Sequence, residues 1–218
     1  MTSLILAMLA FLTSHAIPAR PRFRDAGIRL LDTVGYHLAY SALSLAVTAW
    51  LAVAFAHAPF IPLWDQQPWM RWVPLAAMFF ACQLIVAGIT SPNPFSIGMG
   101  GRGFDPEHPG ILRLTRHPLF WALVLWAGAH MVPNGDLAAL ILFAPLLLLA
   151  LAGPALMERK RRRSLGPEPF AALALRTRTP SWGVLGEIGP WRLGGGAALY
   201  GMLLFLHPMV IGVSPLPN

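Results

Sequence analysis

The stretch TRHPLFWALVLWAGAHMVPNGD, residues 115–136, decides how the chain folds. It opens with the basic, turn-like segment Arg116-His117-Pro118 and continues as an apolar segment that carries His130 near its far end. The turn Pro133-Asn134-Gly135-Asp136 follows, and its aspartate is a good N-cap for a second apolar segment. Because a turn this short joins antiparallel neighbours, the stretch predicts a hairpin of two apolar helices over residues 118–156.

The composition around this hairpin is that of a membrane protein. Of 218 residues, 56% are hydrophobic and only 11% are charged, whereas a soluble domain carries roughly 25% charged residues. Several apolar runs approach the ~20 residues that cross a hydrocarbon core of ~30 Å. The runs are residues 3–17, 36–57, 72–90, 118–132, 137–156 and 195–213. We therefore predict an all-α, polytopic membrane helical bundle of about six transmembrane helices, forming a single domain over residues 1–218.

The net charge of +7 is concentrated between the apolar runs. Residues 18–35, 91–117 and 157–194 hold every Lys and Arg except Arg71. This placement follows the positive-inside rule rather than the pattern of a nucleic-acid-binding surface. No basic residue precedes the first run, which therefore predicts a retained helix rather than a signal peptide. We expect the lipid bilayer as partner, no nucleic acid, an outward-facing N-terminus, and a long polar connector over residues 91–117.

Two histidines in the apolar runs are candidates for chemistry. His130 follows Ala127-Gly128-Ala129, and His15 lies near the inner end of the first run. Ionisable residues inside a membrane are costly and are functional candidates by default. A neutral imidazole can ligate haem iron or another transition metal, and small residues before it allow a cofactor or a second helix to approach. The alternative, a histidine bonded to a carbonyl or to headgroups at the interface, stays open for both.

Arg116 and His117 also have two interpretations. They can anchor the hairpin at headgroup level, with Pro118 in the first helical position where its missing N–H costs nothing. They can instead bind an anionic ligand such as a phosphate or carboxylate. His117 cannot share a metal with His130, because thirteen helical residues separate them by ~20 Å. Glu158, an acid at the inner interface, can pair with the arginines that follow it.

The order of these motifs resembles that of the NnrU family, bacterial integral membrane proteins named from denitrification gene clusters. The resemblance covers most of the chain and implies a place in the bacterial inner membrane, a periplasmic N-terminus and a nitrogen-oxide-related or denitrification role. The matching pieces are Ser14-His15 with Pro18 and Arg20, Ser91-Pro92-Asn93-Pro94-Phe95-Ser96, Gly110-Ile111-Leu112-Arg113-Leu114-Thr115-Arg116-His117-Pro118, Trp121, Trp126-Ala127-Gly128-Ala129-His130 and Asn134-Gly135-Asp136-Leu137-Ala138.

The NnrU family looks related to zeta-carotene isomerase, a membrane protein that uses histidine-ligated haem b for a redox-gated cis–trans isomerisation. Carried over, this resemblance implies haem b with His15 and His130 as metal ligands, Arg116 and His117 near a propionate or another anion, and an apolar small-molecule substrate. Ala127 stands where the isomerase has a cysteine, so a thiolate switch is absent. Counted at 1.5 Å per residue, the two histidines differ in depth by ~9 Å, which leaves the partner of His130 open.

A weaker resemblance is to isoprenylcysteine carboxyl methyltransferases. It is carried by Arg116-His117-Pro118, Glu158, Leu165-Gly166, Phe170 and Thr179-Pro180. That family binds S-adenosylmethionine at this face, which implies a methyltransferase-like membrane enzyme as the alternative function. Phe120 and Ala122 depart from the Tyr and Gly usual there. A non-enzymatic membrane accessory protein or transporter is the third hypothesis.

Overall fold

The computed structural model describes residues 1–218 except 19, 178–182 and 218. It divides into two compact units, one of residues 1–65 with 135–142 and one of residues 66–134 with 143–218. The elements of the described residues are all helices, apart from one isolated bridge between Pro62 and Asp136. The predicted all-α class is therefore confirmed.

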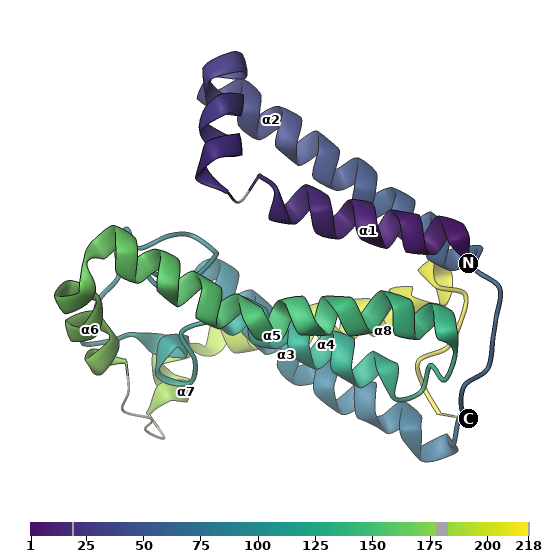
Figure 1. Ribbon diagram of the computed structural model, residues 1–218. Helices are drawn as coiled ribbons and strands as arrows, with labels where there is room; N and C mark the ends of the chain where they lie inside the picture. Colours follow the sequence, from purple (N-terminus) through teal and green to yellow (C-terminus); the bar gives the residue numbers. More distant parts are fainter. Residues whose placement is uncertain (19, 178–182, 218) are drawn as a thin grey trace. The chain divides into compact units, whose positions relative to one another are not determined.

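In the first unit, α1 (Thr2–Ala16) packs along α2 (Pro21–Ala56), as Figure 1 shows. The two helices are antiparallel, since Trp50 contacts Ser3 and Tyr40 contacts His15. Asp32 breaks α2 with a φ of 58°. Its Oδ1 accepts hydrogen bonds from the N–H groups of residues 34 and 35, so it caps the apolar helix that follows.

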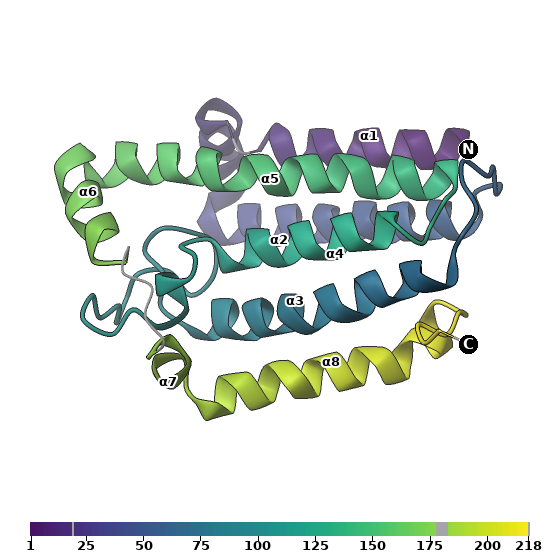
Figure 2. The same cartoon turned by 90° about the horizontal axis from the view of Figure 1, so that it is seen from below.

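In the second unit, α3 (Trp72–Thr90), preceded by the short η1 (Pro68–Arg71), lies between α4 (Pro118–Met131) and α8 (Pro190–Val210) (Figure 2). The part of α5 (Leu137–Leu165) that belongs to this unit packs on α4. Glycines mark the close contacts, because they let helix backbones approach. Gly88 faces Pro118 and Leu119, Gly153 faces Phe120, and Gly196 faces Gln83.

One end of the second unit has a core of its own. Residues 91–117, which include η2 (Gly110–Arg113), pack with α6 (Pro167–Arg176) and α7 (Val184–Ile188). The buried cluster consists of Ala87, Phe95, Ile111, Leu112, Phe170, Val184 and Ile188. The expected long polar connector is thus a folded cap, which the sequence interpretation missed because the apolar side chains are spaced irregularly among Gly and Pro.

Each predicted apolar run corresponds to a helix, but α2 begins at Pro21 rather than at residue 36, and α8 begins at Pro190 rather than at residue 195. Within the described residues, four helices are long and apolar enough to cross a membrane, and two are shorter, Thr2–Ala16 and Pro118–Met131. These helices bear out a multi-pass membrane bundle. α4 begins at Pro118, as predicted, and residues 110–113 before it form a separate turn of 3₁₀ helix. Its 14 residues therefore span only ~21 Å. α5 runs on through the basic block to residue 165 rather than ending at 156.

Candidate functional site

Three charged or titratable side chains meet where α4 begins. The Nε and Nη2 atoms of Arg116 donate to Oε1 of Glu158 at 3.1 and 2.6 Å. The Nε2 atom of His117 donates to the same oxygen at 3.3 Å. Glu158 lies on α5, some 40 residues further along the chain, so the hairpin brings these groups together. They form the Arg116–His117–Glu158 cluster.

The partner of Glu158 differs from the one that the sequence suggested. Its helical neighbours Arg161 and Arg162 have other contacts: Arg161 donates to the Ser96 carbonyl at 3.2 Å, and Arg162 lies 5.2 Å from the centre of the Phe170 ring. The carboxylate therefore pairs with Arg116 instead. Local spacing could not reveal this pair, because it depends on how the hairpin closes.

Asn93 holds the backbone just before α4. Its Nδ2 donates to the carbonyl of Arg116 at 3.0 Å. Its Oδ1 accepts the N–H groups of Phe95 and Ser96 at 2.9 and 3.1 Å. The side chain is fully buried, so these bonds are shielded from competing water. Asn93 thus fixes the position of the Arg116 backbone, where the chain passes from the folded cap into α4.

His117 is buried to the extent that only 5% of its side chain is exposed. Burial lowers the pKa of His117, and the hydrogen bond to Glu158 opposes this shift only in part. The imidazole is therefore neutral near pH 7. A carboxylate can only accept, so Nε2 carries the proton and Nδ1 carries the lone pair. Among the described residues, Nδ1 has no hydrogen-bond partner.

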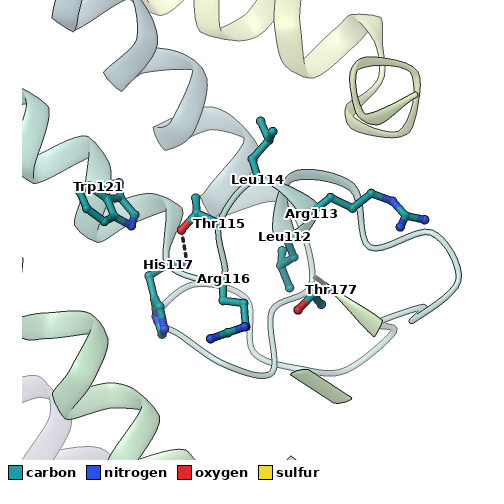
Figure 3. A pocket seen from close by; sticks show the side chains of 8 residues that line it. All are labelled: Leu112, Arg113, Leu114, Thr115, Arg116, His117, Trp121 and Thr177. Atoms are coloured by element: carbon teal, nitrogen blue, oxygen red, sulfur yellow. Dashed lines mark hydrogen bonds between the residues drawn. The ribbon is translucent and has the colours of Figure 1, made fainter. Parts of the chain in front are cut away.

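Two neighbouring pockets adjoin this cluster. The first, of about 350 Å³, is lined by Leu112, Arg113, Leu114, Thr115, Arg116, His117, Trp121 and Thr177. Figure 3 shows Arg116 and His117 next to one another there, with Arg113 pointing away from them. The second, of about 380 Å³, is lined by Arg116, Glu158, Arg162, Phe170, Ala171, Ala174 and Leu175. Arg116 takes part in both.

The two arginines that line the first pocket already have acidic partners. Arg113 forms an ion pair with Glu187 of α7 at 2.7 Å, with under a fifth of each side chain exposed. Arg116 shares one carboxylate with His117, and Arg162 lies on the second pocket without an acidic contact among the described residues. Arginine presents a planar set of donors that suits carboxylates and phosphates. An oxyanion at the cluster would share Arg116 with Glu158.

Most residues that carry the methyltransferase resemblance come together here. Arg116, Glu158 and Phe170 line the second pocket, and His117 lines the first. Gly166 ends α5 and starts α6 with a φ of 91°, a conformation that glycine adopts readily. Thr179-Pro180 lies outside the described residues.

His130 lies at the other end of α4, ~20 Å along the helix from His117. Its Nδ1 donates to the Trp126 carbonyl at 2.8 Å, which leaves the lone pair on Nε2. The ring stacks on Phe143 with centroids 5.5 Å apart. Ala127 and Ala129 are buried, and Gly128 faces Leu147. The small residues before His130 therefore serve helix packing.

His15 belongs to the first unit. Its Nδ1 donates to the Phe11 carbonyl at 2.7 Å, and its ring lies 6.4 Å from that of Tyr40. His37 and His57 make the same bond to the carbonyl four residues earlier. This bond prepares Nε2 to be a ligand but does not single out His15 or His130. Since the two belong to different units, their pairing as haem ligands stays a prediction.

Other metal chemistry finds less support. Within the described ranges, no group of three or more His, Cys, Asp or Glu side chains could hold a metal ion. Cys82 is buried in α3, as expected for a packing residue.

The comparisons with known proteins confirm the resemblance to the NnrU family. A sequence model of the NnrU family, described as NnrU protein, matches residues 3–215. Among curated proteins none matches the chain, and none does among solved structures.

Proposed function

The chain belongs to the NnrU family, and we propose that this multi-pass membrane protein binds a small molecule with an anionic group, such as a carboxylate or a phosphate, at the Arg116–His117–Glu158 cluster. The observation that carries the proposal is His117. Its side chain is 5% exposed, lines a pocket of about 350 Å³, and keeps one ring nitrogen without a partner among the described residues. Buried polar groups are normally satisfied, and exceptions call for an explanation such as a ligand.

The surroundings of His117 support a binding site over a simple anchor. An anchor at headgroup level would leave Arg116 in contact with lipid or water, yet Arg116 is bound to Glu158 and lies 5.8 Å from the Phe95 ring centre. A pre-organised guanidinium loses little entropy when a ligand arrives. Titratable groups that meet beside a pocket are typical of functional sites.

S-adenosylmethionine is the specific ligand that the methyltransferase resemblance suggests for this site. It carries a carboxylate that an arginine can bind and an adenine ring that can stack on an aromatic side chain. Phe170 on the wall of the second pocket is such a side chain. This makes a methyltransferase-like membrane enzyme the best-supported enzymatic form of the proposal.

Calorimetric titration of the purified, detergent-solubilised chain tests the proposal. We expect binding of S-adenosylmethionine or of inorganic phosphate, with affinity at least about tenfold weaker in Arg116→Gln. Arg71→Gln is the matched control, because Arg71 contacts Gln66 and the Leu216 carbonyl away from the pockets. Absence of heat with both ligands, or equal losses in both variants, would contradict the proposal.

The second candidate function is a haem b protein with a redox-linked, isomerase-like or nitrogen-oxide-related role. The favouring observation is that Nδ1 of His130 and of His15 each donates to a backbone carbonyl, which fixes the tautomer that a metal-bound histidine needs. The two imidazoles are of a type that could ligate the iron of a bound haem. Bound haem would supply electron transfer. His130 would ligate the iron, and Phe143 would keep the imidazole ring of His130 in its orientation.

A reduced-minus-oxidised spectrum of the purified protein from haem-replete cells tests this candidate. We expect a haem b spectrum that is lost in His15→Ala and in His130→Ala. His57→Ala is the control, because His57 makes the same backbone bond at the end of α2. A colourless wild-type protein would sink the haem hypothesis and leave the pocket proposal intact.

A further inference from the structure

We infer that the first part of α2, residues 21–31, lies in the plane of the membrane surface as an amphipathic helix that binds anionic phospholipids. We call this segment the interfacial helix. It belongs to the first unit, whereas the Arg116–His117–Glu158 cluster belongs to the second. Lipid binding by the interfacial helix therefore does not depend on the ligand of that cluster.

A backbone turn at Asp32 separates the interfacial helix from the apolar part of α2 (Figure 1). The φ of 58° and ψ of −178° at this residue form a conformation that is costly for residues other than glycine. Gly27 packs on Tyr36 across the turn, since a Cβ atom at Gly27 would lie 2.6 Å from two carbons of the Tyr36 ring. The interfacial helix thus has a direction of its own instead of extending α2.

The chain fixes the interfacial helix at one end of the apolar helices α1 and α2. α1 ends at Ala16, shortly before the interfacial helix begins, and the apolar part of α2 starts directly after Asp32. The ring of His15, near the end of α1, lies 6.4 Å from that of Tyr40, so these two ends lie on the same side. Because both of its ends are tied to apolar helices of a membrane protein, the interfacial helix lies at the depth of the lipid headgroups.

One face of the interfacial helix is an apolar stripe. Its members have the spacing i, i+3, i+4, i+7 and i+8 that places side chains on one side of an α-helix. They are Phe23, Ala26, Gly27, Leu30 and Leu31. Gly27 packs on Tyr36, but Leu30 is 82% exposed and Phe23 is 54% exposed. Acyl chains at the membrane surface would remove these large side chains from water.

The remaining faces of the interfacial helix carry the charge that selects the lipid. Arg22, Asp25 and Arg29 lie opposite the stripe, with Arg24 at its border and Arg20 just before the helix. All of these side chains are exposed. Four positive charges against one negative charge favour anionic headgroups. A second copy of the chain on the same face would place arginines against arginines, which disfavours self-association.

Nitroxide scanning of the full chain in proteoliposomes tests the position of the interfacial helix. The label is placed on introduced cysteines, since native Cys82 is buried. Oxygen, which concentrates in lipid, should relax labels on the stripe more than a water-soluble nickel chelate does, and labels on the polar face should show the reverse. The stripe variants are Phe23→Cys, Ala26→Cys and Leu30→Cys, and the polar variants are Arg22→Cys, Asp25→Cys and Arg29→Cys. Equal access of nickel to both sets, or shielding of the stripe from both reagents by protein, overturns the inference.

Lipid-specific quenching tests the preference for anionic headgroups. A fluorophore on Leu30→Cys is quenched by phosphatidylglycerol or by phosphatidylcholine, each carrying the same nitroxide on an acyl chain. We expect phosphatidylglycerol to quench at least about threefold more effectively. In a chain that also carries Arg22→Gln, Arg24→Gln and Arg29→Gln, the two lipids should quench almost equally, because most of the positive charge of the interfacial helix is gone.

A matched control removes the same amount of charge elsewhere. Arg159→Gln, Lys160→Gln and Arg163→Gln together neutralise exposed side chains of α5 and should leave the preference at Leu30→Cys intact. Equal quenching by both lipids in the parent chain, or an equal loss of preference in the two triple variants, overturns the inference. If the arginine variant does not fold, high salt is the second measurement. Screening should remove the preference, and a preference that salt leaves unchanged also overturns the inference.

Discussion

Asn93 is the single residue on which the geometry of the Arg116–His117–Glu158 cluster depends most directly. It is fully buried and makes three hydrogen bonds, one to the Arg116 carbonyl and two within its own turn. We expect Asn93→Ala to lower the free energy of unfolding by about 3 kcal/mol, since each buried bond contributes roughly 1 kcal/mol and the backbone groups lose their partner. Thermal or denaturant unfolding in detergent measures this loss.

Two comparisons make the Asn93 result specific. Asn134→Ala removes a single hydrogen bond, from Nδ2 to the His130 carbonyl at 2.7 Å, so its loss should be about a third as large. Asn93→Asp keeps the acceptor of the turn but places a carboxylate beside the Arg116 carbonyl. If Asn93→Ala were as mild as Asn134→Ala, the turn would not hold the cluster as argued.

The residues of the site were only partly accessible to sequence reasoning. Arg116 and His117 stand out because basic side chains before an apolar helix are conspicuous. Glu158 was recognised as an acid at the membrane interface. Its predicted pairing with the arginines that follow it was wrong, because the observed ion pair with Arg116 joins residues far apart in the chain. Asn93 gave no signal of its own role, since an asparagine between prolines is typical of any turn.

At the scale of elements, the packing of α4 on α5 depends on Gly153. A Cβ atom there would lie 2.1 Å from Cε1 of Phe120, so the aromatic ring would have to move. We expect Gly153→Ala to lower the free energy of unfolding by up to about 2 kcal/mol, because overpacking costs about 1–3 kcal/mol and the gain in helix propensity offsets only ~1 kcal/mol of it. Unfolding midpoints in detergent measure the change.

Gly128→Ala is the matched control in the same helix pair. Its Cβ would meet Leu147 only at 3.7 and 3.9 Å, an ordinary contact. This substitution should be neutral or slightly stabilising through helix propensity. Phe120→Leu should relieve the cost of Gly153→Ala, so the double variant should show a coupling energy. Equal effects of the two alanines would refute the close contact.

Hydropathy predicted the apolar helices and missed the elements that fold between them. Each predicted run became a helix, because an apolar segment in lipid must satisfy its backbone hydrogen bonds internally. The cap of residues 91–117 with α6 and α7 was not predicted, because its core joins isolated apolar residues such as Phe95, Leu112 and Phe170. Such long-range contacts leave no periodic pattern in a sequence.

At the scale of the whole molecule, the structure of the second unit bears on topology. α4 spans only ~21 Å of a ~30 Å hydrocarbon core, so its length alone does not decide whether it crosses. The hydrogen bonds at the ends of α4 and α5 give more information about the topology. Arg116 before α4 bonds Glu158 near the end of α5, and Arg161 bonds the Ser96 carbonyl. Residues 91–117 and the end of α5 therefore lie at the same end of the second unit.

This arrangement predicts the sides of the membrane on which three positions lie. Native Cys82 is buried, so an impermeant maleimide should react only with a cysteine introduced at an exposed site. We expect Arg102→Cys and Ser164→Cys to be labelled only after bacterial cells are permeabilised, because Arg102 lies in a basic connector and Ser164 lies at the basic end of α5. Gln67→Cys, before α3, should be labelled in intact cells. Labelling of Arg102→Cys and Ser164→Cys from opposite sides would show that α4 and α5 do not form one hairpin. Labelling of both in intact cells would reverse the predicted periplasmic N-terminus while leaving the hairpin intact.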